Sequence, residues 1–136
     1  MRSTFTLDLN RWADKVRGRM DAVVKKVCLD LDRSLVLSTR VDTGRARGGW
    51  GAGVNNVSLR QAIQDPSGAI TLRENAGEIN KAKAGDTIYL TNNVEYIVYL
   101  NDGTDKFSGD FMVEKSLRRF PQIIRESTNQ AKREHP

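Results

Sequence analysis

The stretch VDTGRARGGWGAG, Val41 to Gly53, follows a long segment of helical periodicity and gathers glycines, two arginines and a tryptophan into one short span. Its Asp42-Thr43-Gly44 start is typical of a turn. From Arg45 to Asn55 we expect an extended segment, which puts Trp50 on one face with small residues and leaves the other face almost bare beyond its arginines. Because a glycine face admits another backbone at close range, we expect a neighbouring chain to pack there.

The glycines of this stretch do not match a phosphate-binding loop. A P-loop requires the pattern G-x-x-x-x-G-K-[ST], and no such lysine follows here. Gly49, Gly51 and Gly53 have the wrong spacing for a dinucleotide fingerprint, and they follow a helical segment where that fingerprint follows a strand. Arg47-Gly48-Gly49 is a single RGG triplet without repeats. The stretch is therefore interpreted as a packing element.

The segment before it predicts a long amphipathic helix from Leu9 to about Ser38, roughly 45 Å at 1.5 Å per residue. Cys28 lies beside the apolar stripe and is expected to be a core thiol rather than a reactive one. A helix this long must lie across a sheet or against another chain. Its apolar residues recur at steps of three and four: Leu9, Trp12, Val16, Met20, Val23, Val27, Leu31 and Leu35.

Downstream, the turn-rich segment 55–68 leads to an expected helix from Ile70 to Ala84, weakened by its internal glycine. The sequence DTIYLT, Asp86 to Thr91, alternates between apolar and polar residues and predicts a strand. The next run, VEYIVYL from Val94 to Leu100, has β-branched residues that favour a strand and aromatic residues at helical spacing that favour a short helix. Periodicity alone leaves both open.

A loop is expected over Asn101 to Asp110, followed by a C-terminal helix from Phe111 to about Asn129 that Pro121 breaks or kinks. These elements together predict an α+β fold, a small mainly antiparallel sheet packed by the long N-terminal helix with a C-terminal helix. The length of 136 residues fits a single domain, residues 1–136, with a flexible arm at about 1–8 and a flexible tail at 130–136.

Charge is distributed unevenly along the chain. The total is +5, yet residues 61–113 carry a net −4, while the segments before and after them are basic. An acidic centre between basic flanks suits head-to-tail contact between copies, or a basic face toward a polyanion. The N-terminus lacks the apolar core of a secretory signal, and no apolar run is long enough to cross a bilayer.

Catalytic and metal-binding patterns were not found. The lone histidine, His135, falls in the expected flexible tail with no nucleophile tied to it by a motif. Asp102, Asp105 and Asp110 are close in sequence, but they lack the order of ligands, glycine and final glutamate that calcium loops use. We therefore expect neither an enzyme nor a cofactor or metal.

The order of the pieces resembles a known family. A long helix is followed by VDTGRARGGW, then by TIYLTNNVEYIVYLNDGT, then by a glycine and the helix start FMVEKSLRRF. This order is similar to that of the tail-completion, or tail-to-head joining, neck proteins of long-tailed bacteriophages. The residues Asp105 to Ser108 depart from the family, whose members commonly carry a Gln-Ala-Pro-like piece there. The resemblance favours a short helix over Glu95 to Leu100.

The resemblance implies a structural virion protein of the neck, assembled in the host bacterial cytoplasm. It implies a homo-oligomeric, hexameric ring between the head connector or head-closure protein and the tail terminator or tail tube protein, without enzymatic activity. A head-closure or tail-terminator ring is the near alternative, and a basic DNA-associated protein the alternative from another class. Genomic DNA in the channel is a further candidate contact.

Candidate contact residues follow from charge and aromatic content. We expect the acidic stretch from Glu95 to Asp110 to face a neighbour's basic residues in the ring. The residues assigned to subunit contact or to DNA are Arg45, Arg47, Trp50, Tyr96, Tyr99, Asp102, Asp105, Arg118 and Arg119.

Overall fold

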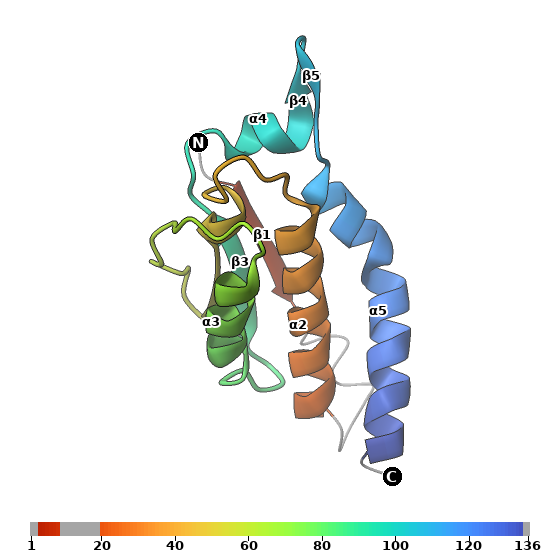
Figure 1. The fold of residues 1–136 in the computed structure, drawn as a ribbon. Coiled ribbons are helices and arrows are strands. Elements are labelled where there is room, and N and C mark those ends of the chain that lie inside the picture. Colours follow the sequence, from red (N-terminus) through yellow and green to blue (C-terminus); the bar gives the residue numbers. More distant parts are fainter. Residues whose placement is uncertain (1–2, 9–19, 135–136) are drawn as a thin grey trace.

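The computed structural model describes residues 3–8 and 20–134, and it has the α+β fold that the sequence predicts (Figure 1). A three-stranded antiparallel sheet of order β1-β3-β2 lies behind helices α3 and α2 in Figure 1, and α5 packs along α2 on the far side from α3. The elements are β1 (Ser3–Asp8), α2 (Met20–Ser38), the 3-10 turn η1 (Arg47–Gly49), β2 (Trp50–Val54), α3 (Ala69–Ile79), β3 (Thr87–Asn92), α4 (Ile97–Asp102), β4 (Gly103–Thr104), β5 (Phe107–Ser108) and α5 (Met112–Glu134).

The central strand of the sheet is β3, which confirms the strand expected from DTIYLT. It pairs with β1 on one side and with β2 on the other. Asn92 of β3 lies opposite Ser3 in β1 and opposite Trp50 in β2. Residues 3–8, expected as an arm, are thus the edge strand β1. The alternation of β3 places Ile88 and Leu90 on the buried face.

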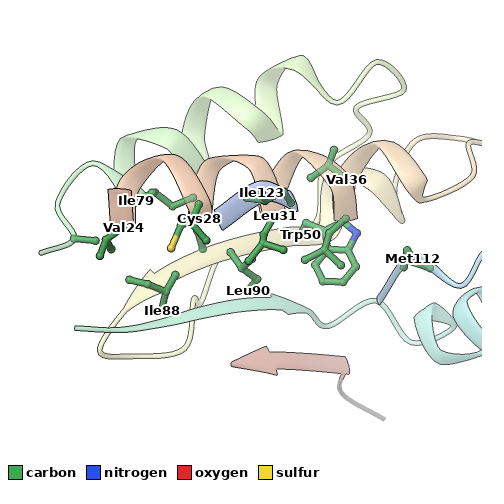
Figure 2. Packing of buried hydrophobic residues seen from close by; sticks show 14 of the residues in the cluster. Val24, Cys28, Leu31, Val36, Trp50, Ile79, Ile88, Leu90, Met112 and Ile123 are labelled. Atoms are coloured by element: carbon green, nitrogen blue, oxygen red, sulfur yellow. The ribbon is translucent and has the colours of Figure 1, made fainter. Parts of the chain in front are cut away.

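The C-terminal part of the expected long helix is confirmed as α2. The part of that prediction before Met20 lies outside the described residues. The apolar stripe of α2, which includes Cys28 and Leu31, faces β3 across the core, and Trp50 of β2 fills the end of the core near Val36 (Figure 2). The fully buried residues of α2 recur at steps of one, three and four along the helix: Val23, Val24, Val27, Cys28, Leu31, Leu35 and Val36.

The stretch after α2 is partly helical, so the expectation of an extended segment from Arg45 is wrong for its first half. Gly44 has a φ of 88° and makes the expected turn. The amide of Gly48 then donates to the carbonyl of Gly44 at 2.8 Å, which closes a helical turn, and the strand begins only at Trp50. The indole Nε1 of Trp50 donates to Thr39 Oγ1 at 2.9 Å, and this buried bond ties β2 to the end of α2.

The glycine face of β2 is covered by the chain itself, where the sequence predicted a neighbouring chain. A Cβ on Gly53 would lie 2.0 Å from the carbonyl oxygen of Asn56, and one on Gly51 would lie 2.5 Å from Ser58 Oγ. The free edge of β2 is also closed. Asn75 of α3 accepts from the amide of Ala52 at 3.3 Å. No further backbone can therefore approach this face without displacing the segment after β2.

The remaining elements differ from prediction mainly at their ends. Helix α3 stops at Ile79, before the expected Ala84, and the ambiguous VEYIVYL run ends in a helix, α4. The expected loop over 101–110 instead contains the end of α4 and the two-stranded hairpin β4-β5. Helix α5 continues through Pro121 to Glu134, with Ala131 buried, so residues 130–134 of the expected tail are helical.

None of the helices in the described ranges is long and apolar enough to cross a membrane.

Candidate subunit-contact surface

The surface that stands out from the domain is formed by residues 95–108, here called the acidic tip. It comprises the short turn before α4, α4 itself and the hairpin β4-β5, and in Figure 1 it projects beyond the end of the helices and the sheet. Tyr96 and Tyr99 are exposed, the latter at 61%. The acidic side chains Glu95, Asp102 and Asp105 are exposed as well, so the tip carries aromatic rings and negative charge outward.

The tip is held to the body by Asn101, which sequence reasoning did not single out. Its side chain is buried, accepts from the amide of Val113 at 3.1 Å and donates to the carboxylate of Glu114 at 3.1 Å. The backbone amide of Phe111 donates to its carbonyl at 3.0 Å. These bonds join the end of α4 to the start of α5, so the tip moves as part of the domain rather than as a free loop.

A second anchor comes from Arg40, two residues after the end of α2. Arg40 Nε donates to Asp110 Oδ1 at 2.8 Å, and its guanidinium lies 4.8 Å from the centre of the Phe107 ring. The bond to the Asp110 carboxylate raises the pKa of Arg40. Cation and ring together fix the hairpin against the segment that leaves α2. Asp110, considered in the sequence as a metal ligand, is therefore engaged in an ion pair.

The structure brings Arg45 to the acidic tip, but within one chain. Arg45 Nη1 donates to Glu95 Oε2 at 2.9 Å, and this hydrogen bond is the main reason that the pKa of the Glu95 carboxyl is lowered. Beside the pair is a hollow of about 300 Å³, lined by Tyr96, Leu100 and Phe107 among others. The exposed ion pair contributes little to stability. The hollow offers an apolar contact next to charge.

Arg47 and Trp50, two of the candidate contact residues, have roles inside the domain. Trp50 is 1% exposed. The guanidinium of Arg47 makes four hydrogen bonds to backbone carbonyl oxygens, among them Pro66 O at 2.8 Å and Thr39 O at 2.8 Å. Arg47 thus joins the end of α2 to the loop before α3, and its charge is occupied by carbonyl dipoles.

Arg118 and Arg119, the remaining candidates, are exposed neighbours that point in different directions. Arg119 Nη1 donates to Ser34 Oγ of α2 at 3.1 Å, beside a groove of about 320 Å³ between α2 and α5 that Arg33 also lines. Arg118 lies on a different face of α5. It has no hydrogen bond or ion pair among the described residues. The two arginines therefore serve different surfaces.

A polar network that connects α2, α3 and β2 was not predicted from the sequence. Asn75 Nδ2 donates to Asp32 Oδ1 at 3.0 Å, and Arg60 donates to the carbonyl of Trp50 at 3.0 Å. Burial raises the pKa of Asp32 to about 7, while the Asn75 hydrogen bond and the charge of Arg60 oppose that rise. The burial of Asp32 could have been predicted, because Asp32 follows Cys28 by four residues and so lies on the same, buried side of α2.

The described ranges contain neither an accessible thiol nor a cluster of metal-binding side chains. Cys28 is buried, and burial followed by the nearby Asp32 charge raises the pKa of its thiol to about 12. Within the described residues, no group of three or more His, Cys, Asp or Glu side chains could hold a metal ion. His135 lies outside these residues.

No protein-family model matches the chain, and neither the curated proteins nor the solved structures include a match.

Proposed function

We propose that the chain is a structural subunit of a ring, the tail-completion or neck protein that joins a phage tail to the DNA-filled head. The observation that carries this proposal is the acidic tip, a rigidly anchored projection that presents two tyrosines and three carboxylates to solvent. The order of motifs in the sequence supports it, because both resembling segments meet at this tip: Arg45 from VDTGR and Tyr96 from the TNNVEYIVYLNDGT run.

A ring needs two different complementary surfaces on each copy. The acidic tip is one of them. The α2-α5 groove is the better candidate for the other, because Arg45 is already paired and Arg47 is occupied by carbonyls. In the groove Lys26 pairs with Asp30, and the second acid, Glu126, accepts from Gln122. Arg33 and Arg119 are then the cations that receive a neighbour's carboxylates. The aromatic rings of the tip would supply the apolar part of the interface.

Charge reversal tests this contact. Asp102→Lys with Asp105→Lys is expected to weaken each subunit contact at least tenfold, which corresponds to about 1.4 kcal/mol, and so to lower the fraction of subunits in rings seen by mass photometry. The matched control, Glu78→Lys with Glu134→Lys, changes the net charge equally at exposed sites away from the tip and is expected to leave the rings intact.

A compensating swap identifies the partner surface. Arg33→Glu with Arg119→Glu should also weaken rings, and combining it with the tip variant should restore them. A wild type that stays monomeric at tens of micromolar with purified tails present would rule out the ring. Unchanged rings in the tip variant would rule out the acidic tip as the contact.

The place of the ring in the particle needs images of particles assembled without this protein. Filled heads separate from finished tails are the expected result. Overlong tails would show instead that the protein terminates tail growth, and heads that lose their DNA would show that it closes the head.

A further inference from the structure

The outer face of α5 carries a line of cations, here called the basic stripe. The buried residues Met112, Ser116, Ile123, Ser127 and Ala131 face the rest of the domain, and the stripe lies on the opposite side of the helix. All of its members are exposed, and they recur at steps of three and four: Lys115, Arg118, Gln122, Arg125, Asn129 and Lys132. At 1.5 Å per residue the stripe is about 25 Å long.

Within the described residues, the acids of α5 form no ion pair with these cations. Glu114 accepts from Asn101, Glu126 accepts from Gln122 at 2.9 Å, and Glu134 accepts from Gln130 at 2.9 Å. Each carboxylate is thus engaged by an amide rather than by a cation. Within residues 20–134 none of the four stripe cations belongs to a salt bridge. Four unpaired positive charges in one line attract a polyanion.

The composition of the stripe favours a nucleic acid over a protein or a membrane. Protein interfaces are depleted in lysine and enriched in aromatic residues and arginine. The stripe contains two lysines beside its two arginines and no aromatic residue. Binding in a membrane interface needs the apolar face of the helix, which here is buried against α2. Asn129 adds a donor of the kind that also binds phosphate oxygens, while the other stripe amide, Gln122, donates to Glu126.

Within nucleic acids, a duplex fits better than a single strand. Single-strand sites combine positive charge with aromatic rings on which bases stack, and such rings are missing from the stripe. A straight line of about 25 Å runs beside about seven base pairs of a regular duplex. We propose that the basic stripe of α5 binds the phosphate backbone of duplex DNA without reading its base sequence. This binding does not depend on ring formation.

The test measures binding of the full chain to two unrelated 20-base-pair duplexes by fluorescence anisotropy, between 50 and 200 mM salt. With four phosphates neutralised, the affinity should fall about 150-fold over this range, and equally for both duplexes. Arg118→Gln, Arg125→Gln and Lys132→Gln together should leave a fall of only about fourfold. The matched control substitutes glutamine at three exposed cations elsewhere: Arg73, Lys83 and Lys106.

Because both triple variants lower the net charge by the same amount, they separate the stripe from overall charge. The control should keep the steep salt dependence of the wild type. Equal losses in the two variants would overturn the proposal, and so would tighter binding to single strands or to vesicles with anionic lipids. A stripe variant that binds DNA normally but no longer forms rings would also overturn it, and would assign the stripe to a second copy. Binding by a chain that never forms rings would support the stripe while refuting the ring.

Discussion

Replacing Asp32 by asparagine should make the protein more stable at pH 8, although the change removes a carboxylate that is hydrogen-bonded to Asn75. The pKa of Asp32 rises from 3.8 to about 7 because the side chain is buried. The folded state therefore holds this proton more tightly than the unfolded chain. Its contribution to stability is fully present below the ordinary aspartate pKa and is lost as the pH rises through the folded value near 7.

The magnitude follows from the size of the shift. At about 1.36 kcal/mol per pKa unit, the wild type should lose on the order of 4 kcal/mol between pH 4 and pH 8, of which about 3 kcal/mol falls between pH 5 and pH 8. Other shifted carboxyls do not mask this change. Asp65, Asp86 and Glu95 have lowered pKa values, so their contributions are lost only as the pH falls below about 4.

The assay is urea unfolding followed by far-ultraviolet circular dichroism at pH 5, 6, 7 and 8. Asparagine keeps an oxygen that accepts from Asn75, so the two proteins should agree within about 1 kcal/mol at pH 5. By pH 8 the midpoint of the Asp32→Asn variant should exceed that of the wild type by about 1.5 M, for a slope of about 2 kcal/mol/M.

The control is Asp30→Asn, which removes a carboxylate of the same helix that pairs with Lys26 at the surface. Its stability should follow the wild type within about 1 kcal/mol at every pH. Parallel curves for the wild type and the Asp32→Asn variant would refute the reasoning, because they would mean that Asp32 is ionised in the folded protein from pH 5 upward.

Three further predictions test the packing. Gly48→Ala should destabilise the protein by about 2 kcal/mol or more in thermal unfolding, because its Cβ would lie 2.0 Å from the carbonyl oxygen of Ile63; Gly77→Ala, where the space is open, should instead stabilise α3 by up to about 1 kcal/mol. Arg47→Met should cost about 1 to 3 kcal/mol in urea unfolding, since the partly buried bonds to Thr39 and the exposed bonds to Leu37 and Pro66 are lost, and a cost below about 0.5 kcal/mol would contradict the assigned role. Cys28 should react with a thiol reagent at pH 8 only as fast as the protein opens, so a reaction as rapid in native buffer as in denaturant would show that it is not buried.

The elements that could be predicted from the sequence are those whose apolar residues repeat with the helical or the strand period. The stripe through Cys28 and Leu31 identified α2, and the alternation of Ile88 and Leu90 identified β3. The hairpin β4-β5 was missed because two-residue strands are too short to show a period. The start of β2 was misplaced because glycines fit a 3-10 turn as readily as a strand.

The candidate contact residues were harder to predict, because charge does not reveal what a side chain contacts. Arg47 and Arg45 look equivalent in the sequence, yet one is bound by carbonyls and the other lies at the acidic tip. The hydrogen-bond partners of Arg60 and Asn75 lie in other segments of the chain, so a local sequence pattern cannot predict these bonds. The positions 115, 118, 125 and 132 could have been seen as one helical face, since their spacing follows the helix period.

The bonded edge of β2 has a consequence for how copies of the protein can associate. The unpaired backbone groups of an exposed edge strand can pair with another chain and cause aggregation. Native proteins protect such edges with charges or covering segments. Here Arg60 and Asn75 occupy the carbonyl of Trp50, and Asn75 occupies the amide of Ala52. A growing fibril would find no template at this edge of the sheet, so contacts at β2 are left to side chains, and the addition of a further strand is confined to the opposite edge, β1.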